Sequence, residues 1–266
     1  MRIRALLGVI ALTTVACGPG GVEERAPFAL ESIDTIRAPL ADDPPHGNPG
    51  PVVSGPIWEG FATTHGQEPT LAAYAHGPLE VFATPDTEEP MTVLDEATIL
   101  GTATVLGVVT APEDGWAEVM LPIRPNGSTG WIRADEVSFY VVDSEIVVDL
   151  TAHELIYLVD GVEILRTDVG IGGEYTETPT GRFFVTDSVT MANPDSPWGP
   201  HALGLSARSE TITEFNGGDG IIGIHGTNNP SSIGDSVSLG CVRLPNEMIT
   251  LLHEMVPLGT RVEIRA

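Results

Sequence analysis

The chain carries a cysteine whose sequence context suits nucleophilic catalysis. Cys241 follows Gly240, so backbone amides can approach a substrate closely there, and Arg243 adds positive charge two residues later. A helix predicted to begin at about Leu244 would direct its N-terminal dipole toward the thiol, which lowers a thiol pKa and favours the thiolate. The amides of Gly240 and Cys241 would then be placed to stabilise an oxyanion. These features predict a reactive thiol, whereas a lone cysteine is otherwise often a small buried apolar residue.

A cysteine nucleophile needs a base within hydrogen-bond reach, and His225 is the best candidate. It ends the apolar run 221–224 and precedes Gly226, a context that favours a cleft over a core. The other histidines lie in or near a linker, at a hairpin, in a Pro/Gly-rich loop or on the predicted helix: His46, His65, His76, His153, His201 and His253. They lack the regular Cys/His/Asp spacing of a zinc site, so we expect no metal and no other cofactor.

Residues 144–266 are predicted to position this pair on a mainly β scaffold. Strands are expected at 145–150, in a hairpin over 153–165, and at 182–186, 221–224 and 260–264. Asp160-Gly161 supplies the turn of the hairpin. Apolar residues at helical spacing over 244–252 predict one short amphipathic helix just after Cys241.

Residues 77–140 form a separate block of short β-type runs divided by Pro, Asp and Gly turns. The block resembles the bacterial Src-homology-3-like small barrel, in which an Asp-Gly-Trp turn and a late Gly-Trp-Ile strand recur; here they are at 114–116 and 130–132. The resemblance implies binding of wall peptides or glycans, and a spacer packed against the next domain is the alternative. The expected fold class is therefore mainly β, with a small β-barrel followed by a β-rich catalytic domain.

The first 17 residues have the pattern of a lipoprotein-type signal peptide. Two arginines precede a short apolar run at 5–12, and the following Ala-Cys step resembles a lipoprotein signal-peptidase site, although Thr14 stands where Leu is usual. Cys17 would carry the lipid and anchor the protein to the membrane in an extracytoplasmic space, the periplasm or the cell-wall space; an ordinary secretory signal is the alternative. Residues 18–76, rich in Pro, Gly and acidic residues, are predicted to be a linker.

The formal net charge of −25 argues against one class of partner. Nucleic-acid binding needs basic patches that neutralise phosphates, whereas the chain has 12 Lys and Arg against 37 Asp and Glu. We therefore expect no nucleic-acid partner.

The segments around the two candidate residues resemble the catalytic domain of the L,D-transpeptidase family. Segment 224–227 is Ile-His-Gly-Thr and segment 238–243 is Ser-Leu-Gly-Cys-Val-Arg, similar to the family's Ile-His-Gly-Thr and Ser-His-Gly-Cys-(Ile/Val)-Arg, with the histidine and the cysteine sixteen positions apart. The turn at 178–183 and the closing strand at 259–262 also resemble the family pattern. One departure is Leu239, which stands where the family usually has a His that helps to orient the site or hold the substrate.

This resemblance implies an acyltransferase that acts on peptidoglycan stem peptides during cell-wall biogenesis. Cys241 would attack a carbonyl of a tetrapeptide stem, and the terminal D-residue would leave with a proton from His225. An amine from a neighbouring stem would then resolve the thioester and form a crosslink.

The remaining residues of the motif are assigned site-shaping roles by the same resemblance. They are Gly226, Thr227, Ser238, Gly240 and Arg243. Arg243 either supports the loop or holds a substrate carboxylate, and a structural ion-pair partner is the alternative. Two alternatives to the transpeptidase stay open: a hydrolase of the L,D-carboxypeptidase type on the same fold, and a catalytically impaired wall-binding lipoprotein, which Leu239 favours.

Overall fold

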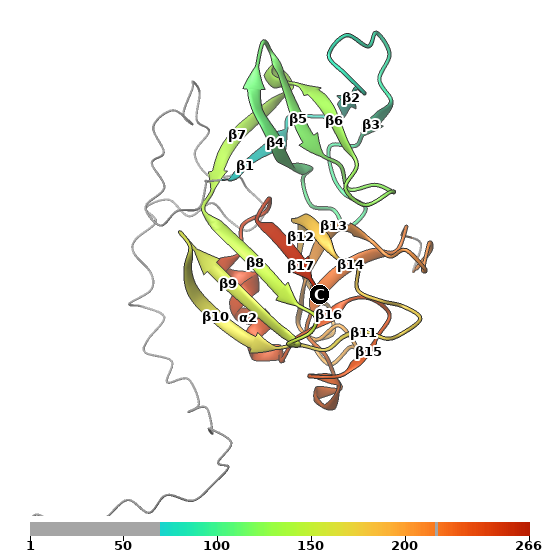
Figure 1. The fold of residues 1–266 in the computed structure, drawn as a ribbon, viewed down its shortest axis with the longest axis vertical. Coiled ribbons are helices and arrows are strands. Elements are labelled where there is room, and N and C mark those ends of the chain that lie inside the picture. The colour runs from blue at the N-terminus through green and yellow to red at the C-terminus, as the bar shows by residue number, and fades with distance from the viewer. Residues whose placement is uncertain (1–69, 216–217) are drawn as a thin grey trace, which may run out of the picture. The chain divides into compact units, whose positions relative to one another are not determined.

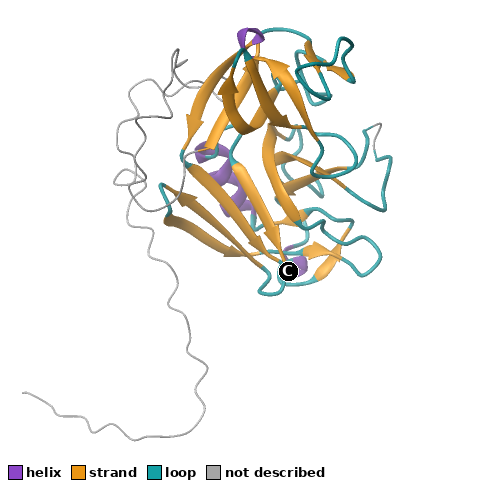
Figure 2. Ribbon diagram, turned by 45° about the horizontal axis from the view of Figure 1, so that its top comes forward, coloured by secondary structure: helices purple, strands orange, loops and turns teal. Residues whose placement is uncertain are grey.

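The structure, a computed structural model, describes residues 70–215 and 218–266 (Figure 1). The predicted signal peptide, the lipidation site Cys17 and most of the predicted linker lie outside the described residues. The described part is mainly β with a single α-helix, α2 (Asn246–Met255), which confirms the expected fold class (Figure 2). All of the described residues belong to one compact unit.

The first sheet is antiparallel and contains five strands. In spatial order these are β6 (Thr129–Arg133), β5 (Trp116–Met120), β4 (Val105–Glu113), β1 (Thr70–Ala75) and β7 (Val137–Val142), with the 3-10 turn η1 (Ala134–Glu136) before β7. A small hairpin of β2 (Leu79–Val81) and β3 (Thr92–Leu94) is joined to it through a bridge between Phe82 and Trp131. We call residues 70–142 the N-terminal sheet domain.

Strand β1 lies in the segment that the sequence analysis assigned to the linker. Its sequence contains three alanines, which are poor strand formers, so local propensity gives little signal. Pairing with β4 on one edge and β7 on the other supplies its backbone hydrogen bonds, and Ala72 and Ala73 are fully buried. The sheet therefore begins at Thr70, before the predicted boundary at residue 77.

The second sheet has eight strands and carries the chemistry. In spatial order they are β10 (Val162–Asp168), β9 (Glu154–Val159), β8 (Ser144–Asp149), β17 (Arg261–Arg265), β12 (Gly181–Thr190), β13 (His201–Arg208), β14 (Ile221–His225) and β16 (Val242–Arg243). The pairs β8–β17 and β14–β16 are parallel. Two very short strands, β11 (Ile171–Gly172) and β15 (Ser236–Ser238), also pair in parallel, and a 3-10 turn, η2 (Pro230–Ser232), precedes β15.

Most elements expected in residues 144–266 are present. The hairpin of β9 and β10 turns at Asp160 and Gly161, whose φ angles of 51° and 74° are those of the predicted two-residue turn. The helix begins at Asn246 rather than Leu244, because Pro245 has an extended ψ of 141° and Leu244 still donates its N–H to the carbonyl of His225.

Strand β13 was not expected from the sequence. Seven of its eight residues are buried, so polar and apolar positions do not alternate, and Gly204 and Ser206 interrupt the apolar run. It pairs with β12 on one edge and β14 on the other, and helix α2 packs against β13 and β14. This central strand therefore supports the strand that ends at His225.

The two sheets share side chains at their junction. Phe184 of β12 is 2% exposed and lies in the core of the N-terminal sheet domain, where its ring packs against Gly107 of β4. In return, Tyr140 of β7 donates its hydroxyl to the carbonyl of Leu258 at 2.9 Å and packs in the core of the eight-stranded sheet. The sheets are therefore joined by interlocked apolar side chains.

Candidate active site

The parallel pairing of β14 with β16 brings the two candidate catalytic residues to one place. Ile224 is opposite Val242, so Cys241, which immediately precedes β16, lies beside Gly223. The Gly223 N–H points to the Cys241 sulfur, with a nitrogen-to-sulfur distance of 3.4 Å. His225 ends β14, and its side chain and that of Cys241 line one cavity. No direct hydrogen bond joins these two side chains in the described residues.

The environment of His225 selects one tautomer. Its Nδ1 lies 2.6 Å from the carbonyl oxygen of Gly226, and a carbonyl can only accept a hydrogen bond. Nδ1 therefore carries the proton, and Nε2 keeps a free lone pair. The ring is 5% exposed and lies against Trp198, with ring centroids 4.5 Å apart. This arrangement leaves Nε2 as the atom that can act as a base.

The turn before Cys241 is shaped by Ser238 and Gly240. Gly240 has a φ of +110°, which L side chains rarely adopt. The buried Ser238 hydroxyl accepts the Gly240 N–H at 3.1 Å and donates to the Cys241 carbonyl at 2.6 Å. The Gly240 amide is thus already engaged, contrary to its expected role toward an oxyanion. The Cys241 N–H makes no hydrogen bond within the described part of the chain and stays available.

The segment after His225 is held by a residue to which the sequence analysis gave no role. Asn246, the first residue of α2, accepts the N–H of Thr227 through Oδ1 at 2.8 Å. A Cβ atom on Gly226 would come within 2.4 Å of the same Oδ1, so a side chain there would push Asn246 away from the Thr227 N–H. Asn246 lies three residues after the end of the cysteine motif at Arg243, and that position was the signal available for it.

The cavity around the thiol has a volume of about 170 Å³ and mainly apolar walls. It is lined by Pro197, Trp198, Ser209, Ile212, Phe215, Gly220, Ile221, Ile222, His225, Ser238, Leu239, Cys241 and Arg243. Arg243 is the basic side chain of this set besides His225, and its Nε is buried without a hydrogen-bond partner among the described residues.

Comparison with known proteins decides the family. Residues 143–264 match the L,D-transpeptidase catalytic domain. The putative L,D-transpeptidase YkuD of Bacillus subtilis (strain 168) is 35% identical over 125 residues, which are 47% of this chain and 68% of that protein. The putative L,D-transpeptidase YqjB of the same strain is 33% identical over 133 residues, 46% of this chain and 71% of that protein. The chain belongs to the L,D-transpeptidase family.

Solved structures of L,D-transpeptidases are also similar, at greater distance. One from Mycobacterium smegmatis is 19% identical with a TM-score of 0.38, and the match covers 71% of this chain and 100% of that chain. L,D-transpeptidase 3 from Mycobacterium tuberculosis, in complex with a faropenem-derived adduct, is 15% identical with a TM-score of 0.40, covering 61% and 91%. These likenesses are too distant to add to the family assignment.

In this member of the L,D-transpeptidase family, Leu239 lines the cavity, and 52% of the residue is exposed. The family resemblance puts a histidine at this position. The other nearby histidine does not replace it, because the ring of His201 stacks on His253 with centroids 4.0 Å apart. His225 is therefore the one imidazole among the described residues that line the cavity.

Burial sets the protonation of both catalytic candidates. It lowers the pKa of His225 to about 4, and the charge of Arg243 adds to this effect while the Gly226 carbonyl opposes it. It also raises the pKa of the Cys241 thiol, more strongly than the Gly223 N–H and Arg243 lower it. The expected depressed thiol pKa is therefore wrong. Near neutral pH the site holds a neutral thiol and a neutral imidazole.

No group of three or more His, Cys, Asp or Glu side chains among the described residues is arranged to hold a metal ion. No helix within the described ranges has the length and apolar character needed to cross a membrane.

Proposed function

We propose that this protein is an exported L,D-transpeptidase that acts on peptidoglycan stem peptides through a thioester on Cys241, with His225 as general acid and base. One observation carries the proposal. Cys241 and His225 line one cavity, because Cys241 directly precedes β16 and His225 ends the neighbouring parallel strand β14. The contact of His225 Nδ1 with the Gly226 carbonyl leaves Nε2 free to take the thiol proton.

The first half-reaction acylates Cys241. Because the thiol is neutral, His225 Nε2 takes its proton as the sulfur attacks the carbonyl of the donor stem. The Cys241 N–H donates to the developing oxyanion. The C–N bond then breaks, the leaving amine takes the proton from Nε2, and a thioester remains on the sulfur.

The second half-reaction transfers the acyl group. An amine of a second stem attacks the thioester carbonyl and gives its proton to Nε2. The C–S bond breaks, the sulfur takes that proton back, and a new amide joins the two stems. If water attacks instead, the product is a shortened stem and the enzyme is a hydrolase.

Arg243 is proposed to bind a carboxylate of the stem peptide. Its half-buried side chain lines the cavity, and no carboxylate side chain belongs to the described lining. A guanidinium favours a carboxylate ligand over a neutral one.

The remaining parts are proposed to place the enzyme at the wall. The N-terminal sheet domain is the Src-homology-3-like small barrel that the Asp-Gly-Trp and Gly-Trp-Ile segments resemble, and it contacts wall peptide or glycan. Residues 1–17 direct export, and a lipid on Cys17 holds the protein at the membrane, with residues 18–69 as the tether. The short apolar run behind two arginines and the Ala-Cys step support this part.

Product analysis tests the reaction. The protein is incubated with a disaccharide tetrapeptide donor, with and without an amine acceptor, and the products are weighed by mass spectrometry. A crosslinked dimer that depends on Cys241 and His225 is the predicted result. A tripeptide product without any dimer would show that the enzyme hydrolyses the thioester and does not transfer the acyl group. No turnover by the folded protein would favour the wall-binding alternative.

A further inference from the structure

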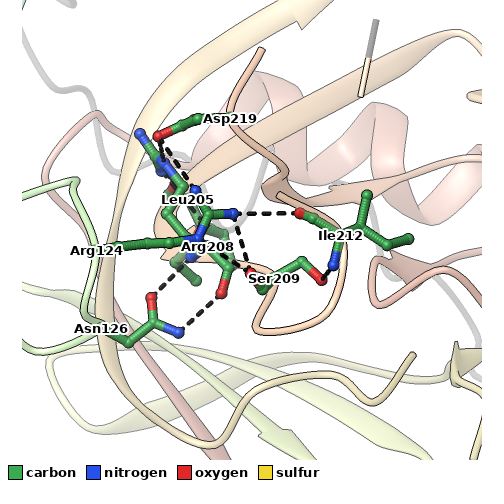
Figure 3. A network of polar contacts seen from close by, with 8 residues as sticks. Arg124, Asn126, Leu205, Arg208, Ser209, Ile212 and Asp219 are labelled. Atoms are coloured by element: carbon green, nitrogen blue, oxygen red, sulfur yellow. Dashed lines mark hydrogen bonds and ion pairs between the residues drawn. The ribbon is translucent and has the colours of Figure 1, made fainter. Parts of the chain in front are cut away.

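An arginine of the N-terminal sheet domain donates hydrogen bonds to the β13–β14 loop, which forms part of the cavity wall. Arg124 lies in the β5–β6 loop, 121–128, and its Nη2 donates to the carbonyl oxygens of Ser209 at 3.0 Å and Ile212 at 3.2 Å (Figure 3). Its Nε also donates to Ser209 O, at 3.3 Å. One guanidinium thus holds two carbonyls of the β13–β14 loop at fixed positions.

A second residue of the same β5–β6 loop fixes the end of β13. Asn126 donates from Nδ2 to the carbonyl of Arg208 at 2.8 Å, and its Oδ1 accepts the Arg208 N–H at 2.8 Å. This reciprocal pair imitates the bonding of a neighbouring strand. Figure 3 shows Asn126 and Arg124 approaching the same stretch of chain from the N-terminal sheet domain.

The two ends of the β13–β14 loop are bonded to each other beside the Arg124 guanidinium. The Ser209 N–H donates to the Gly220 carbonyl at 2.8 Å, and Asp219 accepts from Arg208 Nε at 2.8 Å and lies 3.8 Å from Arg124 Nη1. Gly220 has a φ of +72°, and a Cβ there would lie 2.0 Å from the Ile212 carbonyl oxygen and 2.9 Å from Arg124 Nη2. A glycine therefore lets the neck of the loop close on the carbonyl of Ile212, which Arg124 also binds.

The residues held in this way belong to the cavity. Ser209, Ile212 and Gly220 line it together with Cys241, whereas Arg124 and Asn126 do not. The loop leads directly into β14, which ends at His225. A displacement of the loop would alter the wall that faces the substrate before it altered the thiol or the imidazole.

We infer that Arg124 and Asn126 are positioning residues through which the N-terminal sheet domain sets the substrate wall of the catalytic cavity. Substrate affinity is then a property of both domains, and the first domain does more than space or tether the second. The kinetic part of this inference rests on the proposed transpeptidase function; the positioning part does not.

The test compares Arg124→Ala, Arg124→Lys and Asn126→Ala with Arg133→Ala in the full chain. Arg133 is a matched control, since it is an arginine of the same domain that stacks on Phe82 and Trp116 instead. Arg124→Ala is expected to raise the KM for the donor stem about tenfold with a much smaller change in kcat, because charged hydrogen bonds to the wall are lost. Arg124→Lys keeps the charge but not the fork, so it should restore part of the loss.

One further measurement keeps the inference testable without turnover. Amide hydrogen exchange over residues 209–215 should become faster in Arg124→Ala and Asn126→Ala and stay unchanged in Arg133→Ala. If the wild-type protein has no transpeptidase activity, this exchange result still decides the positioning role. If Arg124→Ala does not fold, Arg124→Lys and Asn126→Ala carry the same comparison. Wild-type KM and wild-type exchange in the folded Arg124 and Asn126 variants would overturn the inference.

Discussion

At the scale of single residues, the site consists of a neutral thiol, Cys241, and a neutral imidazole, His225, that line the same cavity. Cys241 is half-buried in the cavity wall and desolvation favours its thiol form, while the buried His225 stays unprotonated. The proton therefore moves during attack and is not lost beforehand. The sequence context of Cys241 suggested a thiolate, because the nearby Arg243 and helix are visible in the sequence, whereas burial is not.

Protonation of His225 is expected to destabilise the fold. Its pKa is about 4 in the folded state against an ordinary value of 6.5, so the unfolded chain takes up the proton first as the pH falls. The stabilisation that the neutral His225 contributes to the free energy of unfolding is complete above pH 6.5. It is lost as the pH falls toward 4, by about 3 kcal/mol in total.

Urea unfolding at pH 7 and pH 4.5 measures this effect. The wild type should lose about 2 to 3 kcal/mol more over this interval than His225→Gln, because the variant has no imidazole to titrate. The variant also corrects for the carboxylates that titrate in the same range. Equal losses in the two proteins would refute a buried neutral His225.

At the scale of elements, the start of α2 fixes the end of β14. Asn246 binds the Thr227 N–H and closes on Gly226, so a side chain of the helix determines where the chain runs after the base. The helix thus contributes through its first side chain, in addition to packing on β13 and β14.

Asn246→Ala is expected to leave the Thr227 amide without its acceptor. The loss of this hydrogen bond should cost about 1 to 2 kcal/mol in the free energy of unfolding and reduce kcat more than it changes the alkylation of Cys241 by iodoacetamide. Asn193→Ala, which alters an exposed loop asparagine that binds the Asp195 N–H, is the control. Equal kcat values for the two variants would contradict a role for α2 in holding the base.

Local sequence signals predicted some elements and missed others for physical reasons. The Asp160-Gly161 turn and the apolar spacing after Cys241 are local, so the β9–β10 hairpin and α2 were predictable. Strands β1 and β13 are stabilised by pairing on both edges and have little alternation of their own. The contacts of Arg124 join residues more than 80 positions apart, and no local pattern in the sequence indicates them.

At the scale of the whole compact unit, the two sheets are expected to unfold together. Phe184 lies on β12 of the eight-stranded sheet, but its ring packs in the core of the N-terminal sheet domain. Loss of the ring would therefore open a cavity at the junction between the two sheets. Charged and polar contacts from Arg124 and Asn126 lie at the same junction. The N-terminal sheet domain therefore supports the catalytic sheet as well as the cavity.

Phe184→Ala should lower the free energy of unfolding by about 3 to 5 kcal/mol, the range for a buried phenylalanine. In urea, the variant should show an earlier midpoint by both near-UV and far-UV circular dichroism. Leu100→Ala, at a site that is 50% exposed, should change the midpoint little. A loss below about 1 kcal/mol in Phe184→Ala would contradict the interlocked junction.

The proposed chemistry requires Cys241 to be a working nucleophile, and the mass of the intact protein after incubation with a carbapenem tests this directly. A carbapenem is a strained cyclic amide, and opening of its ring by the thiol leaves a thioester of defined added mass. We predict one adduct on the wild type, its absence in Cys241→Ala, and a much slower adduct in His225→Gln. A folded wild-type protein that stays unmodified, or an adduct that persists in Cys241→Ala, would contradict the account.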